Sequence, residues 1–392
     1  MTSDGDPPEF PFGGMPFLGD LGRLLGAGGA GNQWGAARQI AFSLANDGQP
    51  EGNVDPTERI EIIELARVAE MRVVDALGLA PPGSGIEIVP VNRTQWADRS
   101  LDAYKPLFER LTAALGQGPA EAAEMDPSDP MSAMLGSMMK MLGPMMLSMT
   151  AGSMVGHLAR RTLGQYDIPI PRSGNEILVV PPNLDEFADE WSLPGQDLRL
   201  WVCLHEITHH LVLSVPHIGS TLQDLLLEFA GGFRSDPGAL EDRLGALDLS
   251  NPDALGDLQS AFGDPEVVLG AITSPEQQAM MPRLEALTAV IIGVVDHTMD
   301  RIGGNLIGSY GRLTEALRRR RVEADQADRF IERMLGLTLT QAAVERGTAF
   351  VEGVIERAGP DGLERLWADA ANLPTPNEVD APGLWLARID LA

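Results

Sequence analysis

The residues that could do chemistry lie together in one stretch, WVCLHEITHH, at positions 201–210. It contains His205, Glu206 and His209 in the spacing His-Glu-x-x-His. On an α-helix this spacing places the two imidazoles one turn apart on the same face, where they can bind a divalent metal, usually zinc. Glu206 can then reach a metal-bound water and take its proton. The motif therefore predicts a metal site with Zn²⁺ as cofactor, His205 and His209 as ligands and Glu206 as general base.

A catalytic zinc also needs a third protein ligand and keeps a further position for water. Glu228 follows His209 with eighteen residues between them, on the next expected helix. This gap resembles that of the zinc peptidases whose third ligand is a glutamate. The alternative third ligand is His297, which lies three residues before Asp300 and so shares a helix face with it. Both candidates stay open.

Three further side chains are candidates for supporting roles. Asp296 could orient a metal-bound imidazole from the second coordination shell. His210 is turned by about 100° from His209 on a regular helix, so it is a donor to an oxyanion rather than a ligand. Tyr310, expected on a later loop, is a second candidate for oxyanion stabilisation.

The elements that must position these groups are mainly helical. Asp197 is the expected N-cap of the motif helix and Pro216 its end. Two β-branched segments just before it, at 166–171 and 176–181, predict a small hairpin or edge strand. The expected helices cover about 34–44, 56–77, 92–115, 219–230, 275–299, 312–323, 327–335, 340–358 and 363–371. We expect an irregular Gly/Pro-rich arm at 1–32 and one domain at 33–392, with its metal-site core at about 165–305.

Composition limits the classes of partner. The 392 residues carry a formal charge of −27 at a pI near 4.5, which argues against nucleic acid and anionic surfaces. The basic run 318–321 lies on a helical pattern and is expected to be a solvated or ion-paired face. Cys203 is the one cysteine, so no internal disulfide forms; it is expected to be a small buried helix residue. The acidic, proline-rich start MTSDGDPPEF does not resemble a secretion signal, and the expected location is the cytoplasm.

Ten of the seventeen methionines lie at 125–154. Lys140 and Pro144 interrupt this run, so it is not expected to span a membrane. A packed core helix is the favoured interpretation, and a surface that binds a protein partner is the alternative. Gly152, Gly156 and Ala159 would let a neighbouring helix approach closely.

Several short pieces, in a shared order, resemble a known family. They are WGAARQIA at 34–41, LVVPPN at 178–183, the metal motif with Val215-Pro216 after it, TSPEQ at 273–277, the arginine run, Arg346-Gly347 and LPT at 373–375. The chain resembles the zincin-like hydrolases of actinobacteria and relatives, described as zinc-dependent metalloproteases or as associated with deazaflavin-coenzyme biosynthesis. The resemblance implies a helical zincin-like metallopeptidase fold and peptidase activity.

One departure from the family pattern bears on the metal site. Where many relatives read Glu-Gly-aromatic-x-Asp, this chain has Ile292-Gly293-Val294-Val295-Asp296. A glutamate at position 292 would be a third ligand, and isoleucine removes it. The favoured hypothesis is a zinc-dependent hydrolase, most simply a peptidase acting on a peptide or protein substrate through a metal-activated water. The alternative is a catalytically impaired zincin-like scaffold or binding protein with a partial or structural metal site. No glycine-rich phosphate-binding loop supports a direct role in coenzyme synthesis.

Overall fold

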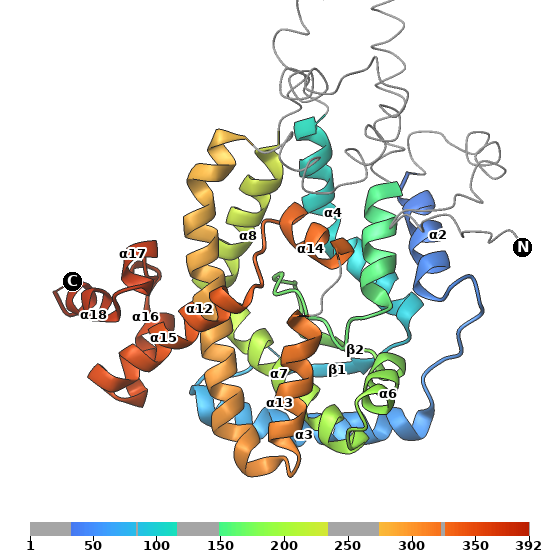
Figure 1. Cartoon of the computed structure of the whole chain (residues 1–392), viewed down its shortest axis with the longest axis horizontal. Coiled ribbons are helices and arrows are strands. Elements are labelled where there is room, and N and C mark those ends of the chain that lie inside the picture. Colours follow the sequence, from blue (N-terminus) through green and yellow to red (C-terminus); the bar gives the residue numbers. More distant parts are fainter. Residues whose placement is uncertain (1–32, 84, 116–148, 234–273, 323–325, 392) are drawn as a thin grey trace, which may run out of the picture.

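Helix α12 (Pro275–Leu306) is the longest helix of the described chain, and it packs against several other helices, among them the helix that carries the metal motif (Figure 1). The computed structural model describes residues 33–391 except 84, 116–148, 234–273 and 323–325. Ser274 caps α12 in a capping box with Gln277, and Pro275 occupies the first turn. The Gln277 amide also donates to the Phe229 carbonyl, 2.8 Å away, and so ties the start of α12 to the end of α8 (Pro216–Gly231).

The remaining elements follow the expected order with a few additions. They are α2 (Gln33–Ala45), α3 (Pro56–Leu77), β1 (Glu87–Pro90), α4 (Arg93–Leu115), β2 (Glu176–Val179), α6 (Pro181–Glu190), α7 (Gly195–Leu213), α13 (Tyr310–Val322), α14 (Gln326–Met334), α15 (Gln341–Ala358), α16 (Arg365–Ala368), α17 (Pro376–Val379) and α18 (Pro382–Leu391). The expected helix at 363–371 is replaced by α16 between two 3₁₀ segments. The mainly helical fold class with a minor sheet is confirmed.

The small sheet differs from the expected hairpin. β2 pairs with β1 in parallel, with Ile88 opposite Ile177, and residues 166–171 form no strand. The hairpin alternative was therefore wrong, while the strand expected at 176–181 does form, as β2. Pro169 and Pro171 lack backbone N–H groups, which disfavours a hydrogen-bonded ladder through that segment. An isolated antiparallel bridge, Gly164 to Val179, joins the preceding residues to β2.

Close helix packing at small residues is confirmed at the N-terminal side of the fold. A Cβ on Gly152 would lie 2.5 Å from the Ala37 carbonyl oxygen, and one on Gly156 would lie 2.8 Å from the Leu44 Cβ. The helical residues 149–159 therefore pack directly on the backbone of α2. Most of the methionine-rich run, and the proposed arm at 1–32, lie outside the described residues.

Within the described chain, α12 alone is long and apolar enough to cross a bilayer. Its most apolar window is, however, 67% buried inside the protein. The same hydrophobicity is thus used to form the core, where Leu284, Val290 and Val295 are almost completely buried.

The tightest helix crossing joins α12 to α15 at two glycines. A Cβ on Gly347 would lie 1.9 Å from the Ala289 carbonyl oxygen, and one on Gly293 would lie 2.3 Å from the Gly347 backbone. Such approaches leave no room for any side chain. Because α12 also packs against the motif helix α7, this crossing fixes one wall beside the predicted metal site.

We predict that Gly347→Ala destabilises the protein by about 1–3 kcal/mol, because the added methyl forces the two helices apart. Gly304→Ala on α12 is the matched control, since a Cβ there meets no atom within 4 Å. The control should be neutral or stabilising by up to about 1 kcal/mol. Urea unfolding of both variants measures the difference, and equal free energies of unfolding would contradict the tight crossing.

Candidate metal centre

The predicted metal-binding motif lies in the middle of α7, which is buried from Trp201 to Leu213. The helix begins at Gly195, so Asp197 is not its N-cap and that prediction was wrong. The Asp197 carboxylate instead accepts hydrogen bonds from the backbone N–H and hydroxyl of Ser309, at 3.0 and 2.6 Å. The helix ends at Leu213, and Pro216 begins α8, so the proline marks the boundary as expected.

The two imidazoles lie side by side, as the motif predicts. The ring centroids of His205 and His209 are 4.4 Å apart. The Nδ1 of His209 lies 3.2 Å from the His205 carbonyl oxygen, which can only accept, so this nitrogen carries the proton and leaves Nε2 with a free lone pair. Burial, reinforced by the charge of His205, holds the pKa of His209 well below its usual range. His209 is therefore neutral, as metal binding requires.

Glu206 is completely buried and held on both oxygens. Its Oε2 accepts hydrogen bonds from the backbone N–H groups of Gln165 and Tyr166, at 2.7 and 2.8 Å. Its Oε1 lies 3.1 Å from the Nδ1 of His205. Burial raises the pKa of the Glu206 carboxyl, while the hydrogen bond from His205 opposes that rise. The carboxyl is thus fixed beside one imidazole.

The segment that holds Glu206, residues 162–167, is named the strap here. A Cβ on Gly164 would lie 2.4 Å from the Glu206 Cδ, so only glycine lets the strap lie against the carboxyl group. The Gly164 carbonyl accepts from the Trp96 indole N–H at 2.9 Å and the Thr162 hydroxyl at 2.6 Å. The strap therefore has a fixed position relative to α7. Sequence reasoning missed it, because neither periodicity nor a motif distinguishes these residues.

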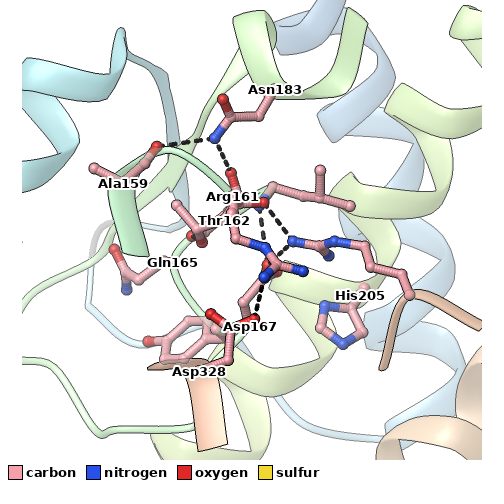
Figure 2. A network of polar contacts seen from close by, with 12 residues as sticks. Ala159, Arg161, Thr162, Gln165, Asp167, Asn183, His205 and Asp328 are labelled. Atoms are coloured by element: carbon pink, nitrogen blue, oxygen red, sulfur yellow. Dashed lines mark hydrogen bonds and ion pairs between the residues drawn. The ribbon is translucent and has the colours of Figure 1, made fainter. Parts of the chain in front are cut away.

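Polar contacts from α6 and α13 anchor the strap (Figure 2). The Asn183 amide at the start of α6 donates to the carbonyls of Ala159 and Thr162, at 2.9 and 2.6 Å. The Arg320 guanidinium on α13 donates to the Arg161 carbonyl and to the Asp167 carboxylate. The strap is thus held between α6 and α13.

The basic run is ion-paired, as the sequence predicts. Arg318 and Arg319 both contact Glu315, while Arg320 contacts Asp167 at 3.0 Å. Arg321 is exposed, and its charge helps to lower the pKa of the buried His209 and opposes the rise in the pKa of the half-buried Asp296. The run thus also contributes positive potential beside the metal motif.

The other candidate residues lie in three different settings. His210 is buried, and its Nδ1 lies 2.9 Å from the Tyr166 hydroxyl; burial lowers its pKa to about 4. Burial raises the pKa of Asp296, and the charges of Arg321 and His205 oppose that rise, so Asp296 lies within electrostatic range of the motif. Tyr310 begins α13 rather than lying on a loop, and its hydroxyl donates to Asp300 at 2.6 Å. The Tyr310 hydroxyl is thus already engaged by a carboxylate.

Neither candidate third ligand joins the histidine pair. Glu228 is exposed on α8. His297 is half-buried, and the charges that act on it come from Arg301, Asp300 and Glu352. Among the described residues, no three His, Cys, Asp or Glu side chains are grouped closely enough to hold a metal ion. The site described here therefore supplies two imidazoles and one adjacent carboxyl group.

Cys203 is buried on α7, as expected, with its thiol 3.9 Å from the Ile62 carbonyl oxygen. Burial, aided by the charge of Glu206, raises its pKa to about 12. The thiolate, which is the nucleophilic and metal-binding form, is therefore strongly disfavoured.

The sequence matches the model of the zincin-like metallopeptidase family over residues 33–386. The chain belongs to this family. A crystal structure from Chloroflexus aurantiacus, described as "a putative hydrolase with a novel fold", is similar with a TM-score of 0.60 and 24% sequence identity. The alignment covers 91% of this chain and 98% of that one, so the two chains share their general fold over most of their length. No curated protein matches the sequence. Neither comparison bears on a deazaflavin association or an actinobacterial source.

In this zincin-like chain we predict that Gly164→Ala displaces Glu206 from the strap, because the added Cβ would overlap its carboxyl carbon. The backbone N–H groups of Gln165 and Tyr166 would lose their acceptor, so their amide hydrogens should exchange faster with solvent. The overpacking should cost about 1–3 kcal/mol. Gly311→Ala is the control, since a Cβ there meets no atom within 4 Å. Unchanged exchange at both amides in Gly164→Ala would contradict the described contact.

Proposed function

We propose that this protein is a zinc-dependent hydrolase that cleaves peptide or protein substrates in the cytoplasm. One observation carries the proposal: the imidazoles of His205 and His209 lie side by side, next to the buried carboxyl group of Glu206. Membership of the zincin-like metallopeptidase family supports it independently. The buried single cysteine is compatible with a reducing compartment.

The residues present fit two of the three protein ligands of a catalytic zinc. The Nε2 of His209 is free because its Nδ1 donates to the His205 carbonyl. When Nδ1 of His205 donates to Glu206, its Nε2 is free in the same way. Fixing one ring nitrogen by a hydrogen bond is how proteins orient metal-binding histidines. Zinc bound there would act as a Lewis acid and lower the pKa of a bound water.

Glu206 is the proposed general base. Two N–H donors occupy its Oε2 and, among the described residues, His205 alone faces its Oε1, so Oε1 is the oxygen that keeps a lone pair for a proton. The raised pKa of the buried carboxyl makes it a stronger base than an exposed glutamate. Its hydrogen bond to His205 keeps Oε1 next to one of the proposed ligands. Asp296 and His210 are proposed as supporting groups, and Tyr310 would have to leave Asp300 to stabilise an oxyanion.

A binding or scaffold protein is the second candidate function. The Glu206 side chain has no exposed surface and the His205 side chain is 10% exposed, so a substrate carbonyl has little access to them in this conformation. The lack of a third ligand group among the described residues points the same way. In that case the metal motif would have a structural role.

Metal analysis and mutagenesis separate the two functions. We expect purified protein to carry about one zinc per chain and to lose it in His205→Ala and His209→Ala. Glu206→Gln should keep the zinc but lose peptide hydrolysis by about 10²–10⁴-fold, because the base is removed and the proposed ligands remain. Metal-free wild-type protein, or full hydrolysis by Glu206→Gln, would contradict the hydrolase.

The same measurement on Glu228→Gln and His297→Gln tests the two proposed third ligands. Loss of zinc in only one of the two variants would identify the substituted residue as the third ligand. Retention in both is the result favoured by their separation from the histidine pair.

A further inference from the structure

Tyr166, in the strap, contacts three groups of the metal motif at once. Its backbone N–H donates to Glu206 Oε2 at 2.8 Å. Its ring is stacked on His209, with centroids 5.9 Å apart and an interplanar angle of 12°. Its hydroxyl lies 2.9 Å from the Nδ1 of His210. Tyr166 thus contacts the proposed base Glu206, the proposed ligand His209 and the next residue, His210.

The stacking restricts the orientation of the His209 ring. The hydrogen bond from Nδ1 to the His205 carbonyl leaves the ring free to tilt about that contact. The Tyr166 ring, which lies nearly parallel against the His209 ring, restricts this tilt. The Nε2 lone pair of His209 therefore keeps one fixed direction. Hydrogen-bond partners that orient a metal-binding histidine commonly change metal affinity by about 10–100-fold when they are removed, and we expect an effect on the same scale from the stacked ring.

Tyr166 can perform this role because the strap itself is held in place. The neighbouring Gln165 side chain accepts from the Leu178 N–H of β2 at 3.3 Å, and Asp167 is held by Arg320. Tyr166 is 2% exposed, so its ring has no alternative position in solvent. The hydroxyl contact to His210 and the stacking on His209 distinguish Tyr166 from a purely apolar core residue, whereas its backbone N–H would donate to Glu206 whatever side chain this position carried.

We propose that Tyr166 is a positioning residue of the metal site, which aligns the His209 imidazole and holds the Glu206 carboxyl beside it. The proposal rests on the proposed zinc-dependent function. The aromatic ring and the backbone N–H carry the effect on His209 and Glu206, and the hydroxyl serves His210. A variant that keeps the ring should therefore keep the alignment, and a variant that removes the ring should lose it.

The test compares Tyr166→Met with Tyr166→Phe, using Tyr104→Met as the matched control. Tyr104 is 1% exposed, and its hydroxyl accepts from Arg172 at 3.1 Å rather than from the motif. Zinc affinity is measured by competition with a chelator after circular dichroism has verified folding. Tyr166→Met should bind zinc about 10–100-fold more weakly than wild type, while Tyr166→Phe and the control stay within about threefold. Equal affinity in Tyr166→Met, or an equal loss in Tyr104→Met, would overturn the proposal.

A second readout does not depend on metal. In the zinc-free protein, nitrogen NMR should find His209 protonated on Nδ1 in wild type and in Tyr166→Phe, with its ring protons shifted by the stacked aromatic ring. Tyr166→Met should lose this shift. If the wild-type protein binds no zinc, the proposed hydrolase function fails. The ring-proton shift of His209 then still tests whether Tyr166 positions this imidazole. If Tyr166→Met does not fold, absence of the shift in wild type and Tyr166→Phe overturns the proposal.

Discussion

The hydrogen bonds from two backbone N–H groups of the strap to the buried Glu206 carboxyl are the interaction on which the site depends. A fully buried carboxyl group is costly unless its oxygens are satisfied. Here the strap satisfies one oxygen and His205 faces the other. The same contacts decide where the strap lies, so the motif helix and a segment with no regular structure stabilise each other.

The rest of the fold fixes the motif helix α7 and the strap relative to each other. Asn183 and Arg320 hold the strap from α6 and α13, which are far apart in sequence. Helix α12 packs along α7, and α15 packs against α12 at the Gly293–Gly347 crossing. Long helices thus set the position of the motif, and short polar contacts set the position of the strap. The arrangement favours a rigid site with restricted access.

The motif and most helices could be predicted from sequence because their signals are local. The spacing of His205 and His209 alone places both on one helix face, and apolar periodicity predicts the long helix α12. The contacts that matter most could not be predicted. Gly164 and Tyr166 act through van der Waals contacts and hydrogen bonds to residues about forty positions later, which no periodicity records. The parallel pairing of β1 with β2 is non-local in the same sense, and the short loop between two β-like segments wrongly favoured a hairpin.

The third ligand shows a further limit of spacing. Glu228 has a suitable distance along the chain from the motif, yet α8 leaves it exposed to solvent. His297 shares α12 with Asp296, but only Asp296 is influenced by His205. A one-residue step on a helix turns a side chain by about 100°, so neighbours in sequence face different surroundings.

Zinc K-edge X-ray absorption on the purified, zinc-loaded protein tests the central claim most directly. The account predicts two imidazole nitrogens at about 2.0–2.1 Å from the metal. His209→Ala should remove one of them. A coordination shell of oxygen atoms alone, or a sulfur ligand at about 2.3 Å from Cys203, would contradict a metal centre built on His205 and His209.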